Sequence, residues 1–248
     1  MKVLFEDNHL LVVDKPAGMA TMGAEDGQMT AHRWACDYVK RKYNKPGNVY
    51  IGVVSRLDRL TTGTLVLART SKAASRLTIQ FGGPGKSKKV TTRATKIYLA
   101  VVEGNISSSA SELEPNVLRD QVYKDDAAHR MRVDRHGKHE SQLAELRYSV
   151  LAKSDQYSLV AVKLLTGRKH QIRLQFADRG FPVVGDKKYG SQQDFGPGIA
   201  LHSWQLAIEH PTKGERLQFS APIPGSWSEH FPWVPSMSKI EPLVADWI

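Results

Sequence analysis

The chain has 248 residues, 41% of them hydrophobic and 24% charged, a balance typical of a folded globular protein. No apolar run approaches the roughly 20 residues that a membrane-spanning helix requires, and the single cysteine, Cys36, excludes an internal disulfide and a multi-cysteine zinc site. The net charge of +10 indicates a polyanionic partner such as nucleic acid, and a generally basic surface is the alternative. We expect a cytoplasmic protein.

The first third of the chain predicts short strands and two helices. The apolar run 9–15 predicts a buried strand that Pro16 and Gly18 end. Thr30 can cap a helix over 31–43, and Ser71 can cap a second helix that runs to residue 81. Two further strands are predicted between these helices, at 48–55 and 64–70.

The rest of the chain alternates in the manner of antiparallel strands. Residues 82–95 are rich in glycine and lysine and predict a loop, and 96–106 predict a strand. The polar stretch 107–145 predicts exposed turns and irregular hairpins. Two strands are expected within 143–167, helical spacing over 168–180, and a final hairpin within 198–222 that turns at 211–214. The simplest architecture is one α+β domain with a mixed, mainly antiparallel sheet and flanking helices and loops.

The stretch SRLDRLTTG, residues 55–63, places Asp58 between Arg56 and Arg59. The two guanidiniums favour the ionised carboxylate, which suits a nucleophile or an ion-pair anchor but not a general acid. If the segment is extended, Arg56 and Asp58 point to one face, because side chains alternate along a strand. On these residues alone, a structural ion pair is the simpler interpretation.

A second basic cluster gathers Arg168, Lys169, His170 and Arg173 within six residues after Gly167. In a helix, Lys169 and Arg173 would share a face, and so would His170 and Arg173, so the repulsion calls for a compensating anion. That anion is a phosphate backbone, a buried aspartate or only bulk counterions. His170 alone receives no catalytic role.

A third basic run lies between residues 85 and 98 and contains no acidic side chain. Its cations favour contacts to a nucleic-acid backbone, and a solvated patch is the alternative; they are Lys86, Lys88, Lys89, Arg93 and Lys96. Tyr98 lies within the strand that follows. It is either a core aromatic or a ring that stacks on a base.

Five segments, in chain order, resemble motifs of the RluA-type family of RNA pseudouridine synthases. They are VVDKPAG (12–18), SRLDRLTTGTLVL (55–67), KIYLAVVEG (96–104), TGRKHQIRLQFADRGFPVVGDKKYG (166–190) and LHSWQLAIEHPTKGERLQFSAPIP (201–224). The resemblance covers residues 9–224, so we expect a single catalytic domain over 1–248. The small RNA-binding domain that many relatives carry in front is not expected here.

This resemblance implies a cofactor-free and metal-free isomerase that converts uridine in ribosomal or transfer RNA to pseudouridine. It makes Asp58 the nucleophile on a flipped-out nucleotide, Arg173 its ion-pair partner, and Tyr98 the ring that stacks on the uracil. The residues expected to contact RNA are Arg56, Arg59, Lys15, Lys86, Lys88, Lys89, Arg93, Lys96, Arg168 and Lys169. We expect a monomer without an obligate protein partner or a membrane partner.

Three positions depart from the family's usual residues. Ser55 stands where histidine is usual, Thr62 where serine is usual, and Gln175 where histidine is often found. These departures concern the RNA target and leave the reaction's residues in place. One alternative is an RNA-binding module with a degenerate site, against which Asp58, Tyr98 and Arg173 argue together. A glycoside hydrolase is the other alternative, and it would need a second acid placed beside Asp58.

Overall fold

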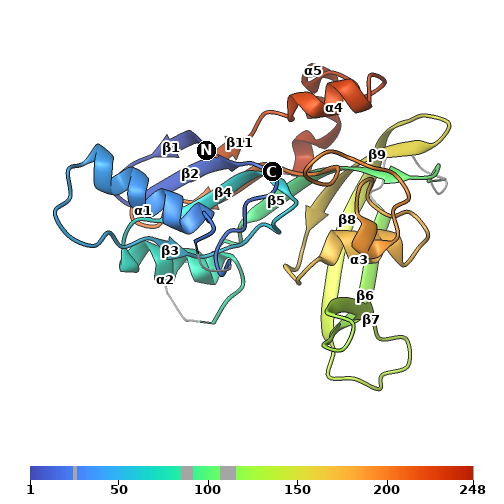
Figure 1. Ribbon diagram of the computed structural model, residues 1–248, viewed down its shortest axis with the longest axis horizontal. Helices are drawn as coiled ribbons and strands as arrows, with labels where there is room; N and C mark the ends of the chain where they lie inside the picture. Colours follow the sequence, from blue (N-terminus) through green and yellow to red (C-terminus); the bar gives the residue numbers. More distant parts are fainter. Residues whose placement is uncertain (25–26, 85–91, 107–115, 248) are drawn as a thin grey trace. The chain divides into compact units, whose positions relative to one another are not determined.

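The computed structural model describes residues 1–24, 27–84, 92–106 and 116–247. The chain folds into two compact units, drawn in Figure 1: Met1–Lys96 with Ser203–Ile223, and Ile97–His202 with Pro224–Ile248. Each unit is a mainly antiparallel sheet with a few helices, which confirms the predicted α+β class. That the chain forms a single catalytic domain stays a prediction, and in it the two units would be the halves of that domain.

The first unit is built on a sheet that follows the order β1, β2, β4, β10, with β11 beside β10 and β3 beside the end of β4. Strand β2 pairs with β4 from Leu10 opposite Ala68 to Lys15 opposite Gly63. The hairpin predicted near the C-terminus is confirmed, because β10 and β11 pair from Gln205 opposite Ser220 onward. The strands are β1 (Lys2–Glu6), β2 (Leu10–Lys15), β3 (Gly52–Val53), β4 (Thr62–Ala68), β10 (Leu201–Glu209) and β11 (Arg216–Ser220).

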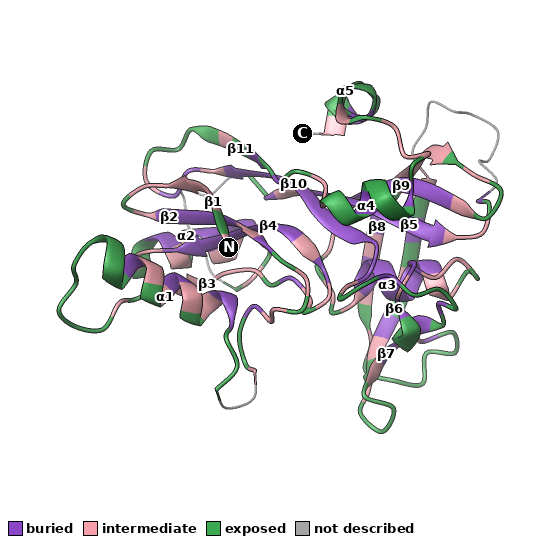
Figure 2. Ribbon diagram, turned by 45° about the horizontal axis from the view of Figure 1, so that its top comes forward, coloured by how far each residue is buried: buried purple, intermediate pink, exposed green. Residues whose placement is uncertain are grey.

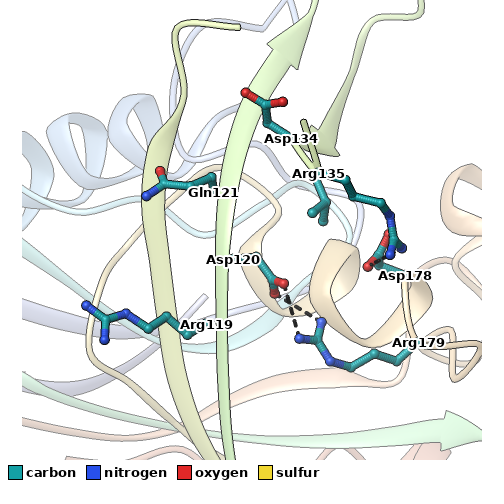
Figure 3. A pocket seen from close by; sticks show the side chains of 8 residues that line it. Arg119, Asp120, Gln121, Asp134, Arg135, Asp178 and Arg179 are labelled. Carbon is teal, nitrogen blue, oxygen red and sulfur yellow. Dashed lines mark hydrogen bonds and ion pairs between the residues drawn. The ribbon is translucent and has the colours of Figure 1, made fainter. Parts of the chain in front are cut away.

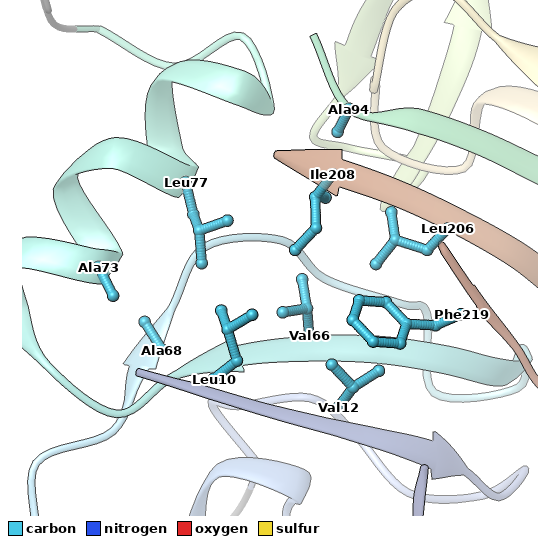
Figure 4. Close-up of a cluster of buried hydrophobic side chains, with 10 residues drawn as sticks. All are labelled: Leu10, Val12, Val66, Ala68, Ala73, Leu77, Ala94, Leu206, Ile208 and Phe219. Atoms are coloured by element: carbon cyan, nitrogen blue, oxygen red, sulfur yellow. The ribbon is translucent and has the colours of Figure 1, made fainter. Parts of the chain in front are cut away.

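A hydrophobic core lies between this sheet and helix α2 (Ser71–Gln80). Because side chains alternate along a strand, every second residue of β2 and β4 enters the core, beside Ala73 and Leu77 of the helix. Figure 4 shows this cluster, which comprises Leu10, Val12, Val66, Ala68, Ala73, Leu77, Ala94, Leu206, Ile208 and Phe219. This packing anchors the two strands whose ends carry the motifs around Lys15 and Gly63.

The helix caps agree with the sequence in one case and differ in the other. Thr30 caps α1 (Ala31–Lys42) as predicted, since its hydroxyl accepts the Arg33 amide at 3.1 Å. The cap of α2 is Thr70 and not Ser71, because the Thr70 hydroxyl accepts the Ala73 amide at 3.2 Å. Both residue types satisfy the amides at a helix start, so the residue that leaves the strand in extended conformation takes the role.

The second unit contains a sheet in the order β5, β9, β8, β6, β7. The predicted pair of strands within 143–167 is confirmed by β8 and β9, which a short turn after Lys153 connects. In Figure 2, most of β5 and β9 is buried. The strands are β5 (Thr95–Glu103), β6 (Asn116–Asp125), β7 (Arg130–Val133), β8 (Gln142–Lys153) and β9 (Tyr157–Leu164).

The prediction of irregular hairpins over 107–145 is wrong for its described part. Strands β6 and β7 form a regular antiparallel hairpin from Val122 opposite Val133 to Asp125 opposite Arg130, and β6 also pairs with β8. Leu118 and Val122 are the two buried residues of β6. These two apolar positions suffice because only one face of the strand packs against the unit.

Helices complete the second unit. Val122, Met131, Ala144, Leu174 and Tyr189 form a small core under α3 (Gln171–Ala177) and the 3₁₀ turn Lys187–Tyr189. The C-terminal segment adds α4 (Gly225–His230), α5 (Met237–Ile240) and a 3₁₀ stretch, Glu241–Trp247. None of the described helices is long and apolar enough to cross a membrane.

Candidate active site

Asp58 lies in an irregular loop between β3 and β4, where it is partly exposed. The prediction of a strand over 48–55 is therefore wrong except at Gly52 and Val53. Because residues 56–58 are not in a strand, alternation no longer predicts that Arg56 and Asp58 point to one face. The reason is tertiary: β2 covers one edge of β4, and β10 takes most of the other edge. Only Leu67 and Ala68 remain for β3 to pair with.

Hydrogen bonds hold the Asp58 loop on both sides of the carboxylate. The Thr21 hydroxyl donates to the Leu57 carbonyl at 2.8 Å and accepts the Leu57 amide at 3.1 Å. On the other side, the Arg59 guanidinium donates from Nε to the Gly18 carbonyl at 3.0 Å. A turn follows, in which the Thr61 amide donates to the Asp58 carbonyl at 3.1 Å. The segment around Gly18 thus positions the Asp58 backbone.

Lys15 lies beneath this loop and is fully buried. Its ammonium donates to the carbonyls of Pro16 at 2.7 Å, Met19 at 2.8 Å and Arg59 at 3.4 Å, which ties the two loops together. Burial lowers the pKa of Lys15 to about 8, and the negative charges of Asp58 and Asp14 oppose that shift. A fully buried amine with these acceptors cannot reach a phosphate, so we correct its predicted role from RNA contact to support of the loop.

Gly63 is required where the motif enters β4. Its φ is +109°, and a Cβ there would lie 2.2 Å from the Ser203 carbonyl oxygen of β10. Hydroxyls hold the two strands together beside it: Thr64 donates to the Trp204 carbonyl at 3.1 Å, and Ser203 donates to the Thr64 carbonyl at 3.1 Å. Only glycine fits this close approach of two backbones.

In the second unit, Tyr98 lies on β5 and is 9% exposed. It pairs with Val162 of β9, which in turn pairs with Tyr148 of β8. Directly paired residues of antiparallel strands share one face of the sheet, and Tyr148 packs edge-on against Phe176 of α3 at 5.2 Å between ring centroids. Tyr98 therefore points to the sheet face that carries α3, the helix of Arg173.

Arg173 makes a buried, two-pronged ion pair with Asp186. Nε donates to Oδ2 at 2.6 Å and Nη2 to Oδ1 at 2.9 Å, and the two side chains are 4% and 0% exposed. The Tyr189 ring lies 5.1 Å from the guanidinium carbon, and its hydroxyl lies 2.9 Å from Nδ1 of His170. Asp186 is thus a buried anion of the kind that the basic cluster required, and the sequence analysis did not name it.

The start of α3 differs from the helical spacing predicted over 168–180. His170 adopts a left-handed conformation with φ +54°, and the helix begins at Gln171. The Gln171 side chain accepts from the Arg168 amide at 3.0 Å and donates to the Glu145 carbonyl at 3.0 Å, which organises the turn. Lys169 lies before the helix, so the prediction that Lys169 and Arg173 share a helix face is wrong.

The other residues expected to contact RNA fall into three groups. Arg56, Arg59, Arg93 and Lys169 are exposed. Arg168 and Lys96 are partly buried: Arg168 donates from Nε to the Leu143 carbonyl at 2.8 Å, and burial, with the Arg93 charge, lowers the pKa of Lys96 to about 8. Lys86, Lys88 and Lys89 lie outside the described residues.

A polar pocket of about 540 Å³ opens between the β6–β7 hairpin and the end of α3. Figure 3 shows Arg179 reaching the Asp120 carboxylate, with contacts of 3.0 and 3.1 Å, and Arg135 beside Asp178. These ion pairs attach the hairpin to α3, and Arg119 on its wall is largely exposed. The lining therefore balances three arginines, Arg119, Arg135 and Arg179, against three aspartates, Asp120, Asp134 and Asp178.

The structure thus divides the predicted catalytic residues between the units. Asp58, with its supporting loop, belongs to the first unit, and Tyr98 and Arg173 belong to the second. The meeting of Asp58 with the other two stays a prediction. A guanidinium carries five N–H donors, so the ion pair with Asp186 is compatible with a second carboxylate partner.

Comparison with known proteins identifies the family of this chain. The sequence signature of the RNA pseudouridylate synthases matches residues 9–178. A Bacillus subtilis protein, "Uncharacterized RNA pseudouridine synthase YlyB", is 34% identical, with 92% of this chain and 71% of that protein covered. "Ribosomal large subunit pseudouridine synthase D" of Pseudomonas aeruginosa is 32% identical, with 96% and 72% covered.

Two solved human structures share the fold. "RNA Pseudouridylate Synthase Domain Containing 1" superposes with a TM-score of 0.72 at 25% identity, covering 98% of this chain and 94% of that one. "RNA Pseudouridylate Synthase Domain Containing 4" gives a TM-score of 0.70 at 21% identity, with 95% of each chain covered.

The fold and the sequence signature therefore define an isomerase that converts uridine in RNA to pseudouridine. The chain belongs to the RNA pseudouridylate synthase family, and within it to the RluA type.

Proposed function

We propose that this chain isomerises specific uridines of ribosomal RNA, with Asp58 as the nucleophile. The observation that carries the proposal is the loop of Asp58, which Thr21, Lys15 and Gly18 hold on both sides while the carboxylate stays partly exposed. Such support is what a nucleophile needs, because small misplacements of a reacting group cost large factors in rate. Relatives named for the large ribosomal subunit support the choice of ribosomal over transfer RNA.

In this reaction, the Asp58 carboxylate attacks a nucleotide that has left the helical stack, at the ribose C1′ or at the uracil C6. The bond between N1 and C1′ breaks, the uracil rotates, and C5 bonds to C1′, and the bond that the carboxylate formed with C1′ or C6 then breaks and regenerates Asp58. The proton that leaves C5 is balanced by the proton that N1 gains, so the step is an isomerisation without a redox partner. Extruding the base costs a few kcal/mol, which stacking and backbone contacts must offset.

Tyr98 and Arg173 take the supporting roles in this proposal. Tyr98 stacks on the extruded uracil and is placed to move a proton. Arg173 pairs with Asp58, while Asp186 holds the guanidinium through Nε and Nη2. Removing one member of a buried ion pair costs about 3–5 kcal/mol, so Asp186 is expected to be as important as Arg173 for the geometry.

The RNA-contacting surface in this proposal comprises the exposed cations and the neighbouring loops. Arg56, Arg59, Arg93 and Lys169 contact phosphates, together with Lys86, Lys88 and Lys89. The β6–β7 hairpin adds Arg119, whose side chain is largely exposed. Replacing Lys86, Lys88 and Lys89 by glutamine should flatten the dependence of RNA affinity on salt, by about one unit of slope for each phosphate that the chain no longer neutralises. An unchanged slope would remove this loop from the RNA-binding surface.

The test of the nucleophile compares Asp58→Asn and Asp58→Ala with Asp37→Asn, a control at an exposed position of α1. Each protein is incubated with transcripts of ribosomal and transfer RNA, and pseudouridine is mapped by sequencing. We expect both Asp58 variants to bind RNA but form no pseudouridine, and the control to match the natural chain. Measurable turnover by either Asp58 variant would refute the assignment, and binding without turnover by the natural chain would support the degenerate module.

A further inference from the structure

The loop that carries Asp186 is closed at its two ends by backbone hydrogen bonds. The Val184 amide donates to the Val101 carbonyl of β5 at 3.0 Å, and the Ala200 amide donates to the Val184 carbonyl at 2.9 Å. The two ends of the segment 184–200 are therefore held next to each other, beside Val101 of β5. Within the loop, Ser191 accepts the Gly185 amide at 2.9 Å and hydrogen-bonds to Glu103.

Phe195 packs inside this loop against Gly185, the residue before Asp186. Gly185 has φ +85°, and a Cβ there would lie 2.6 Å from the Phe195 Cβ. Phe195 is 7% exposed, although its neighbours from Gln192 to Pro197 are exposed. The backbone just before Asp186 thus packs closely against Phe195, beside the hydrogen bond from the Gly185 amide to Ser191.

The C-terminal segment covers that side chain. Phe231 stacks on Phe195 with ring centroids 5.4 Å apart and planes at 16°, and His230 and Trp227 lie edge-on at 4.9 and 6.4 Å. Trp227 and Phe231 are 1% and 3% exposed, so this contact is a core and not a surface patch. Tyr157 of β9 closes the cluster against Phe231 at 5.9 Å.

We propose that helix α4 and Phe231 act as a positioning element for catalysis. Through Phe195 and Gly185 they fix the Asp186 carboxylate, which in turn orients the Arg173 guanidinium. The proposal rests on the catalytic role of Arg173 given under the proposed function. Phe195, Trp227 and Phe231 are then positioning residues, since each acts on the reaction only through Asp186.

The experiment measures single-turnover pseudouridine formation and RNA affinity for Phe195→Ala, with a transcript of ribosomal RNA that the natural chain modifies. We expect a rate loss of roughly 10- to 100-fold, the scale of a misplacement near 1 Å, with an RNA affinity within about threefold of the natural value. Phe195→Leu should restore most of the rate. Phe219→Ala, at a position of equal burial (8% exposed) in the first unit, controls for the loss of a core aromatic ring.

Two further measurements separate positioning from general damage. In an Arg173→Lys background, Phe195→Ala should change the rate by less than about threefold, because the two residues act in one chain of contacts. Hydrogen exchange of the 185–191 amides should quicken in Phe195→Ala and stay unchanged in Phe219→Ala. Fully additive rate losses, unchanged exchange at 185–191, or an active Phe195→Ala would each overturn the inference. A natural chain that makes no pseudouridine would instead overturn the proposed function.

Discussion

Replacing Gly63 by alanine tests whether the close approach of β4 to β10 fixes the start of the strand that follows the Asp58 loop. The new Cβ would lie 2.2 Å from the Ser203 carbonyl oxygen and 2.9 Å from the Ser203 nitrogen. Both are main-chain atoms of a buried strand, so a side-chain rotation cannot relieve the contact. The strands must separate, against the hydroxyl bonds of Thr64 and Ser203.

The expected loss has two parts. Alanine at a φ of +109° is strained by about 1–3 kcal/mol, and an overpacked site in a core adds about 1–3 kcal/mol. Gly214→Ala is the matched control, because Gly214 has a φ of +81° and nothing lies within 4 Å of its added Cβ. The control should lose only the part due to backbone strain, on the order of 1 kcal/mol.

The assay is urea unfolding of both variants, followed by single-turnover pseudouridine formation in the absence of urea. We expect Gly63→Ala to lower the free energy of unfolding by about 1–3 kcal/mol more than Gly214→Ala, since only Gly63 adds a packing conflict to the strain. Activity should fall in Gly63→Ala even where the variant is fully folded. Equal unfolding free energies of the two variants would refute the reasoning from the contact with Ser203.

Three further outcomes are expected. Lys15→Met should destabilise the chain at pH 7. The difference in unfolding free energy between the natural chain and this variant should widen by up to about 3 kcal/mol between pH 8 and 10.5, because over that range Lys15 holds a proton in the unfolded chain that it has lost in the folded one. A difference independent of pH would contradict a buried amine with a lowered pKa. Burial raises the pKa of Glu6, but hydrogen bonds from Lys42, Tyr38 and Tyr43 outweigh it and lower the pKa to about 2. Unfolding of Glu6→Gln should therefore show a deficit, on the order of 1 kcal/mol after screening, that is full above pH 4.5 and vanishes as the pH falls toward 2; a deficit that persists near pH 2 would count against this. Arg173→Lys should lower the single-turnover rate at least about 100-fold, since lysine cannot make both bonds to Asp186, and near-normal turnover would argue against an oriented guanidinium.

The local features of the chain were readable from its residues. The Thr30 cap, the apolar run of β2 and the β10–β11 hairpin follow from cap chemistry and hydrophobic periodicity, and the structure confirms them. The family also followed from the residues, because five motifs occur in order along the chain and the sequence signature covers 9–178. These features depend on neighbours in sequence, so the sequence alone contains the information.

The partners of charged groups depended on contacts between distant residues. The sequence shows that Arg173 needs an anion, but Asp186 is one of several carboxylates in the chain. Only the folded loop 184–200 places the Asp186 Oδ2 atom 2.6 Å from the Arg173 Nε atom. Lys15 was expected to contact RNA from the family resemblance, and only the structure shows it buried against three carbonyls of two separate loops. Charge can be read from composition, but burial cannot.

The sequence by itself determined the class of fold, the family and the identity of the candidate nucleophile. The tertiary structure decided that Asp58 lies in a loop and not at the end of a strand, because β10 occupies the edge of β4 that a longer β3 would need. It also decided that Gly63 must be glycine, since the carbonyl of Ser203, 140 positions along the chain, fills the space of a side chain. Both restrictions, on the length of β3 and on the residue at position 63, arise from packing between segments that are far apart in the sequence.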